Sequence, residues 1–195
     1  MANGPIYRVA LRRRREGKTN YHRRRELLKS DHMRLIIRRS TKNMRVQLIE
    51  AHPDGDKTKV YASSKQLVNH GWTVSGGNIP AAYLTGYLAG KKAVNAGISS
   101  AILDLGLQRN SVGSRIYAAL KGVIDAGVEV PANDKIFPPE DVLMGSHIKA
   151  ISSNIKAEDK KDFTSRYAKY QKSKVDPEKL DKLVKSTMEA IDKLK

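Results

Sequence analysis

The chain has 195 residues, of which 37 are Lys or Arg and 20 are Asp or Glu, for a formal net charge of +17. This length suffices for one domain with a core plus appended segments, and the excess of positive charge predicts an anionic partner. Cysteine is absent, which excludes disulfides, thiolate metal ligands and a thiol nucleophile. No apolar run approaches the roughly 20 residues of a membrane span, and the opening MANGPIYRVALRRRR lacks the pattern of a secretory signal. We therefore expect a soluble, intracellular protein.

The positive charge is concentrated at the amino terminus. Residues 1–45 contain 15 basic and three acidic residues, and therefore carry +12 of the net charge of +17. Like charges at this density oppose a compact fold through self-repulsion. They are typical of a segment that lies against a polyanion, where displaced counterions supply binding free energy.

The type of basic residue indicates which class of polyanion is the partner. Twelve of the 15 are Arg, and a guanidinium can bind a phosphate through two parallel hydrogen bonds and also stack on an exposed base. Tyr7, Tyr21 and His22 lie among the arginines as further stacking groups. These features predict contact with nucleic acid, with RNA favoured. The alternatives are a solvated charge run, a disordered tail or a localisation signal.

The first 63 residues divide into an arm and three strands. Residues 1–32 have no wide apolar face, so we expect extended chain that becomes ordered on its partner, except for a short helix from Asn20 to Lys29. Period-two alternation and a turn at Pro53–Asp56 then predict strands over 34–39, 44–50 and 58–63. Consecutive strands with short connections form an antiparallel meander. One of its faces should be apolar, and the other should extend the basic surface.

The next segments, in order, are predicted as a short helix over 64–70, a long helix over 81–95, a strand over 100–105, a helix over 116–126 and a brief strand over 128–130. A strand after a helix predicts a crossover and parallel pairing. Small residues on one side of the 81–95 helix predict close packing against a sheet or helix, with contact to RNA as the alternative. This order predicts an α/β domain with a mixed sheet.

After Pro138 and Pro139 the chain becomes polar and helical. We expect helices over 140–153 and 157–172, and a third over 176–194 with a single apolar stripe. Such a stripe packs on the parent domain in most proteins, and docking onto a partner is the alternative.

Catalytic patterns are not apparent. Acidic residues on the predicted strands are few, and Asp104 and Asp125 are interpreted as structural carboxylates. Ser111 and Ser114 lie in no G-x-S-x-G motif, and Ser114 is predicted to cap its helix. The five His residues show no metal-ligand spacing. We predict no catalysis, cofactor or metal; the rivals are a metal-dependent nuclease that uses Asp104 and a membrane-surface protein.

Several segments together resemble one known family. GPIYRVALRRRREGKTNYHRRRELLKS, MRLIIRRSTKNMRVQLIE, the stretch from GNIPAAYLTGYLAG to VEVPAN, and FTSRYAKYQKSKVDPEKL occur in the order of the L-eighteen family of large-subunit ribosomal proteins, archaeal and eukaryotic type. The similarity runs from Gly4 to about Leu180. It implies a ribonuclease-H-like three-layer unit with a mixed five-stranded sheet and helices on its faces.

The resemblance also implies a function. Such a protein binds 5S rRNA and attaches it to the large-subunit rRNA in the central protuberance, beside neighbouring large-subunit ribosomal proteins, in the cytoplasm. No membrane and no small-molecule substrate is implied. The carboxy-terminal helix, 176–195, is where the family pattern is loosest.

The domains and RNA-binding residues follow from these arguments. We expect a basic RNA-binding arm over 1–32, an α/β core domain over 33–137 and a helical extension over 138–195. The predicted RNA contacts are Arg8, Arg12, Arg13, Arg14, Arg15, Lys18, Tyr21, His22, Arg23, Arg24, Arg25, Lys29, Arg34, Arg38, Arg39, Lys42 and Arg45.

Overall fold

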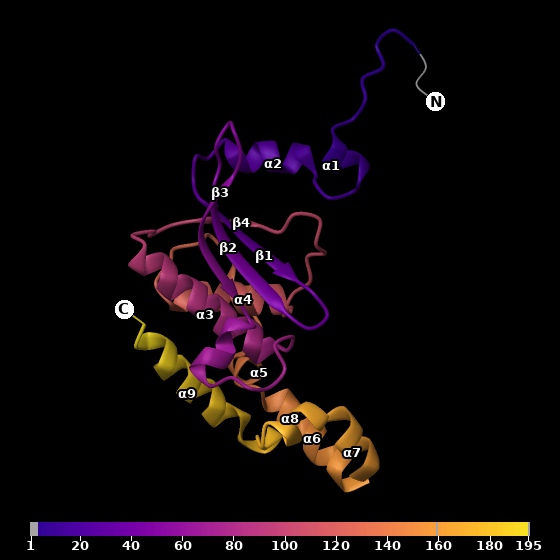
Figure 1. Ribbon diagram of the computed structural model, residues 1–195, viewed down its shortest axis with the longest axis vertical. Helices are drawn as coiled ribbons and strands as arrows, with labels where there is room; N and C mark the ends of the chain where they lie inside the picture. The colour runs from indigo at the N-terminus through magenta and orange to yellow at the C-terminus, as the bar shows by residue number, and fades with distance from the viewer. Residues whose placement is uncertain (1–3, 159, 195) are drawn as a thin grey trace.

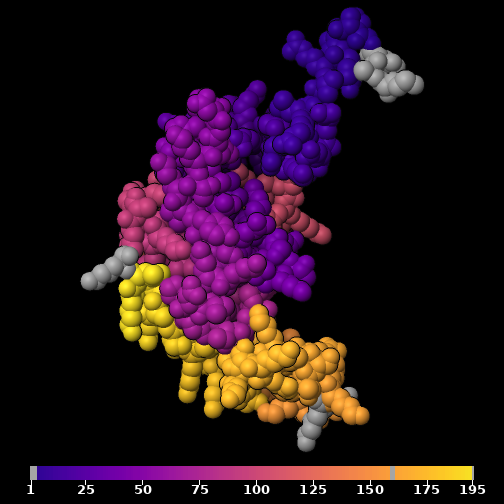
Figure 2. Space-filling model, in the orientation of Figure 1, coloured from indigo at the N-terminus to yellow at the C-terminus, as the bar shows by residue number. Residues whose placement is uncertain are grey.

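A computed structural model describes residues 4–158 and 160–194. Residues 1–3 of the predicted arm and residues 159 and 195 of the predicted extension lie outside this range. The α/β body occupies the middle of an elongated molecule (Figure 1), with the amino-terminal arm at one end and a helical extension at the other. Figure 2 shows the arm as a separate lobe above the body, so much of its surface is open to solvent.

The sheet has the predicted meander and one parallel strand. β1 (Arg34–Arg39), β2 (Met44–Glu50) and β3 (Lys57–Ser63) pair antiparallel in sequence order. β4 (Ile102–Asp104) pairs parallel to β1, so the strand order is β3-β2-β1-β4. The expected crossover and parallel pairing are confirmed.

The long helices of the body pack on one face of this sheet. Leu35 and Ile37 of β1 and Val46 and Leu48 of β2 are fully buried in one apolar core with α3 (Ile79–Asn95) and α4 (Arg115–Asp125). These two helices lie close together, because Gly86 and Gly122 leave no room for a Cβ against the opposing backbone. The small residues of α3 therefore serve helix packing rather than RNA contact.

The sheet has four strands, not the five expected. Val128–Val130 contributes only one parallel bridge, between Glu129 and Ser100. The segment is short because Gly127 ends the preceding helix at φ 107° and Pro131 has no N–H for a further ladder bond. Since α3 and α4 share one face, the ribonuclease-H-like three-layer arrangement stays a prediction.

The arm contains more helix than expected. α2 (Tyr21–Leu28) confirms the predicted helix, and the Asn20 side chain caps it by accepting a hydrogen bond from the Arg23 N–H at 3.2 Å. The expectation of extended chain before it is wrong for α1 (Arg12–Arg15), a single helical turn. The chain reverses after α1 at Gly17, which adopts φ 62°.

The remaining helices lie outside the sheet and the α3–α4 pair. They are the 3-10 helices η1 (Gln66–His70), η2 (Asp134–Ile136) and η3 (Pro177–Lys179), and the α-helices α5 (Glu140–Met144), α6 (Ser146–Glu158), α7 (Lys160–Arg166), α8 (Ala168–Lys172) and α9 (Leu180–Asp192). The two helices expected over 140–153 and 157–172 are thus four pieces. The first break is at Gly145, which has φ 94°. None of the described helices is long and apolar enough to cross a membrane.

The apolar stripe of α9 packs on the parent domain. Leu180, Val184 and Ile191 are almost fully buried, and α9 contacts α3. The Tyr87 hydroxyl of α3 donates to Asp192 Oδ1 at 2.7 Å and reinforces the contact. Packing on the body, rather than on a partner, therefore accounts for this stripe.

Candidate nucleic-acid interface

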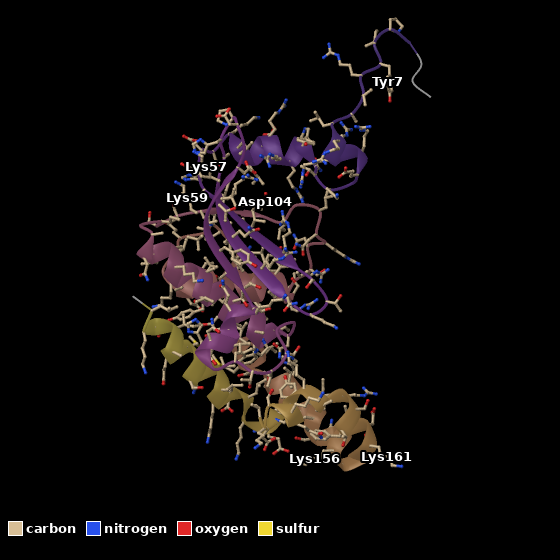
Figure 3. The ribbon with its side chains drawn as sticks, in the orientation of Figure 1. Tyr7, Lys57, Lys59, Asp104, Lys156 and Lys161 are labelled. Carbon is tan, nitrogen blue, oxygen red and sulfur yellow. The ribbon has the colours of Figure 1, made fainter. Side chains whose placement is uncertain are left out.

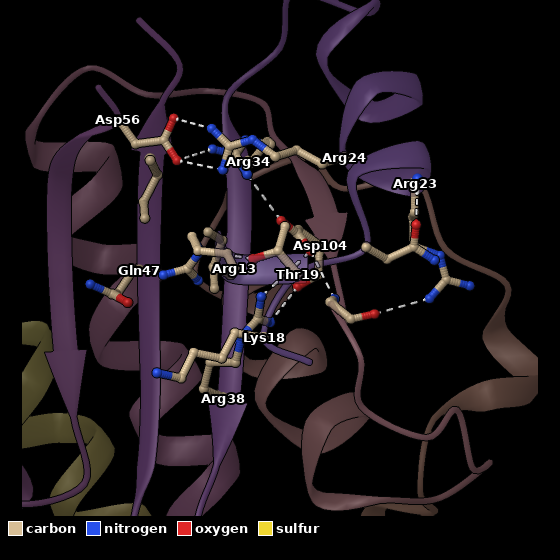
Figure 4. Close-up of a pocket in the computed structure, with 14 residues that line it drawn as sticks. Arg13, Lys18, Thr19, Arg23, Arg24, Arg34, Arg38, Gln47, Asp56 and Asp104 are labelled. Atoms are coloured by element: carbon tan, nitrogen blue, oxygen red, sulfur yellow. Dashed lines mark hydrogen bonds and ion pairs between the residues drawn. The ribbon is translucent and has the colours of Figure 1, made fainter. Parts of the chain in front are cut away.

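Two neighbouring arginines of α2 tie the arm to the body. Arg24 donates two parallel hydrogen bonds to the carboxylate of Asp56, at 2.7 and 2.9 Å (Figure 4). Arg23 donates to the backbone carbonyl of Gly106 at 3.1 Å. Asp56 precedes β3 and Gly106 follows β4, so the helix is held at two separated points. We call these two contacts the arm clamp.

The arm clamp continues into the sheet as a chain of alternating charges. Asp56 also accepts from Arg34 at 2.7 Å, and Arg34 donates to Asp104 at 3.1 Å. Asp104 in turn lies 3.5 Å from a guanidinium nitrogen of Arg38. Each carboxylate thus bridges two arginines, and its negative charge offsets the repulsion between their guanidinium groups.

Arg34 differs from its expected role. It is only 1% exposed and is enclosed by its two carboxylate partners. A guanidinium buried this deeply requires paired carboxylates, because an isolated buried charge is strongly unfavourable. The structure thus makes Arg34 a structural ion-pair residue rather than a surface contact for RNA. Asp104 has the structural role predicted for it.

These contacts shift the pKa values of the groups involved. Partial burial alone would raise the pKa of Asp56, but the hydrogen bonds and charges of Arg24 and Arg34 outweigh it and lower the pKa. Burial lowers the pKa of Arg38, against the opposing effect of Asp104. Asp56 therefore stays ionised below the usual Asp range, and the arm clamp persists there.

A cavity of about 440 Å³ lies between the arm and the open face of the sheet (Figure 4). Six cationic side chains and two carboxylates line it, which leaves four positive charges in excess. The lining residues are Arg13, Lys18, Thr19, Asn20, Arg23, Arg24, Arg34, Ile36, Arg38, Gln47, Ile49, Asp56, Asp104 and Gly106.

Most of the other predicted contacts are exposed. The side chains of Arg12 and Arg25 are 75% and 74% exposed, and their nearest carboxylates are 4.0 Å away. Tyr21, Arg24 and Arg38 are half-buried. Those on the surface are Arg8, Arg12, Arg13, Arg14, Arg15, Lys18, His22, Arg23, Arg25, Lys29, Arg39, Lys42 and Arg45.

The basic surface continues from the arm over one end of the sheet. Figure 3 shows Tyr7 beyond α1, away from the sheet, and Lys57 and Lys59 of β3 near the end of α2. Lys59 is held by Glu50 at 3.0 Å. Exposed cations therefore lie both on the arm and on the adjoining end of the sheet.

Comparison with known proteins identifies the family. Residues 6–99 and 94–133 match a family described as "Ribosomal large subunit proteins 60S L5, and 50S L18". The large ribosomal subunit protein uL18 of Korarchaeum cryptofilum is 44% identical over 191 residues, which cover 98% of this chain and 97% of that protein. The protein of the same name from Methanothrix thermoacetophila is 52% identical over 149 residues, or 76% of this chain and 88% of that protein.

The chain belongs to the uL18 family. Proteins of the uL18 family are structural components of the large ribosomal subunit and not enzymes, so the predicted resemblance and the predicted absence of catalysis are confirmed by membership. The protein is accordingly a cytoplasmic ribosome component. The exposed cations therefore lie on a protein whose surroundings are rich in RNA.

Sequence reasoning missed the role of Asp56 and was only partly right about Ser114. The sequence predicts only a turn at Asp56, because its position 32 residues from Arg24 carries no local signal of their pairing. Ser114 stands at the N-cap of α4 as predicted, but its side chain makes no capping bond. Its Oγ is buried with no hydrogen-bond partner among the described residues.

Other residues hold the neighbouring loops in place. Arg115 donates to the carbonyls of Gly77 and Ser40, at 2.5 and 3.3 Å, and so fixes the tip of the β1–β2 hairpin. Gln108 donates to the Ile37 carbonyl at 2.9 Å and keeps the loop after β4 beside β1. Both loops are thus fixed by side-chain hydrogen bonds.

Proposed function

We propose that this chain binds 5S rRNA and attaches it to the large-subunit rRNA in the central protuberance, with neighbouring large-subunit ribosomal proteins beside it. The observation that carries the proposal is the row of exposed arginines on an arm that the body holds in position. Arginines fixed this way meet phosphates without first ordering the chain, which lowers the entropic cost of binding. Family membership supports the same partners.

The proposed mechanism is electrostatic. Exposed guanidinium groups of the arm and sheet edge pair with phosphates and release counterions, which makes affinity fall steeply with salt. Selectivity then comes from RNA shape and from unstacked bases, because the major groove of A-form RNA is too deep and narrow for side chains to read. The proposed contacts exclude Arg34, which is buried, and Arg24, which is paired with Asp56.

Salt-dependent binding tests the proposal. The whole chain, a version that begins at Asp31 and a full-length variant with Arg12–Arg15 all changed to Gln are titrated with 5S rRNA and with a mismatched RNA of equal length. We expect tight, 5S-selective binding by the whole chain and a steep salt slope that falls in both altered proteins. Circular dichroism checks that each remains folded. Equal binding of the two RNAs by the whole chain would contradict the proposal.

A further inference from the structure

The cavity between the arm and the sheet is bounded by contacts within the chain itself. Its roof is the arm, held by the arm clamp through the paired bonds of Arg24 to Asp56 and the bond of Arg23 to Gly106. Its floor is the face of β1 and β2 opposite to the helices. At about 440 Å³ it falls within the size range of pockets for small organic ligands.

The floor of the cavity includes two aliphatic side chains and one amide, with Arg34 and Arg38 on the same face of β1. Ile36 is 9% exposed and Ile49 is 8% exposed. Gln47 pairs with Ile36 across the two strands and lies two residues from Ile49, so all three side chains occupy one face of the sheet. A flat aliphatic surface with a polar group beside it suits the face and edge of a planar ring.

The amide of Gln47 is free to bind a ligand. Its side chain has no hydrogen-bond partner in the described part of the chain, although the residue is half-buried. A Gln side chain offers two donors and one acceptor. Amide side chains can bind the donor–acceptor edge of a base through two hydrogen bonds, as they do with adenine.

The rim of the cavity carries cations with unused donors. Arg13 uses its Nε to bond the Thr19 hydroxyl at 2.8 Å, and no hydrogen bond of its terminal nitrogens is found among the described residues. Lys18 pairs with Glu16 at 2.8 Å but its side chain remains 63% exposed. Both groups can therefore receive a phosphate at the mouth of the cavity.

The geometry points to a nucleotide pocket. We propose that one unstacked nucleotide of the bound RNA enters this cavity, with its base on Ile36 and Ile49, its edge on Gln47 and its phosphate at Arg13 and Lys18. This inference rests on the proposed function and adds a specific site to it. It explains why the arm is held above the sheet instead of lying flat on it, and it makes one nucleotide a determinant of affinity.

Variants of the whole chain test the pocket through RNA binding. Gln47→Leu keeps the volume of the side chain and removes its amide, and we expect it to weaken binding of 5S rRNA about tenfold, as the loss of one well-held base does. The salt slope should stay unchanged, because no phosphate contact is lost. Lys18→Gln should instead lower the slope by about 0.7–0.9. Gln171→Leu, at an exposed position of α8, is the matched control and should have no effect.

A second measurement uses the wild-type chain, so its result does not depend on whether a variant folds. Isoleucine-methyl NMR of the wild-type chain is recorded with AMP, GMP, CMP or UMP and, separately, with inorganic phosphate. We expect the mononucleotides to shift the methyl signals of Ile36 and Ile49 and to leave Ile191, in α9, unchanged. Phosphate should leave the two floor residues unchanged.

The possible outcomes separate the pocket from the proposed function. If 5S rRNA binds selectively while Gln47→Leu matches the wild type, or if phosphate shifts Ile36 and Ile49 as much as mononucleotides do, the pocket is overturned and the function stands. If the wild type shows no 5S selectivity, the function fails. In that case a mononucleotide-specific shift would still support the pocket, and no shift would overturn it as well.

Discussion

The two ends of the chain attach to the same body by opposite physical means. The carboxy-terminal α9 is held by apolar burial, with Val184 and Ile191 fully enclosed. The amino-terminal α2 is held by the arm clamp, in which the Arg24 and Asp56 side chains remain 32% and 24% exposed. Apolar burial is not weakened by electrostatic screening, whereas partly exposed ion pairs weaken as the salt concentration rises. The first attachment suits a permanent part of the fold, and the second suits a segment that must also bind a polyanion.

The same contrast recurs between neighbouring arginines of the arm. Arg24 donates its hydrogen bonds to Asp56, while the side chain of Arg25 is 74% exposed. One residue positions the helix, and the next is open to a phosphate. Neighbouring arginines of one run therefore have two different roles, positioning of the helix and contact with phosphate.

The largest expected effect is at the apolar attachment. Val184→Asp places a charge in the core between α9 and the body, and should lower the free energy of unfolding by about 3 kcal/mol or more. Thermal denaturation measures it. The matched control is Lys185→Asp at the exposed neighbour, which should change stability by less than about 0.5 kcal/mol. Equal effects of the two would mean that α9 is not packed as described.

The next effect is at the arm clamp. Asp56→Asn removes the charge that Arg24 and Arg34 share, and we expect a loss of about 1–2 kcal/mol together with faster amide exchange in α2. Hydrogen exchange followed by mass spectrometry reads α2 and α9 in one experiment, and α9 should be unchanged. Asp54→Asn, in the same turn, is the control. Unchanged exchange in α2 of the Asp56 variant would refute the arm clamp.

A smaller effect separates the two neighbouring arginines. Arg25→Ala should reduce the salt slope of RNA binding by about 0.7–0.9, one phosphate contact. Arg24→Ala should weaken binding with little change in slope, because it disturbs the position of the arm rather than a phosphate. Titrations over a range of salt concentrations compare them. A larger slope change for Arg24 than for Arg25 would reverse the assignment.

The smallest effect is that of pH. The pKa of Asp56 is lowered in the folded chain, so its contribution to stability is fully present above the usual Asp pKa of about 3.9 and is lost as the pH falls through the lower folded value. Amide exchange in α2, corrected for the intrinsic rate, should therefore accelerate below about pH 4. Asp56→Asn should abolish this dependence. An unchanged acid response in that variant would assign it to another group.

Much of this architecture is determined by local sequence. Period-two alternation in 34–39 and 44–50 defines two strands, and Pro80 and Gly97 frame the long helix α3. The density of arginine in the arm predicts a polyanion without any knowledge of the fold. These features depend on neighbours along the chain, which a sequence displays directly.

Only the tertiary structure decided which arginines are exposed and so available to contact a partner. Arg34 and Arg45 both lie on strands amid apolar residues, yet Arg34 is buried between Asp56 and Asp104 while Arg45 is exposed. The partners of Arg34 stand 22 and 70 residues away, and the missing fifth strand likewise reflects how few residues reach the sheet edge. A local pattern assigns a side chain to a face of a strand. What covers that face depends on segments brought there by folding, and this divides the same residue type into structural ion pairs and exposed contacts.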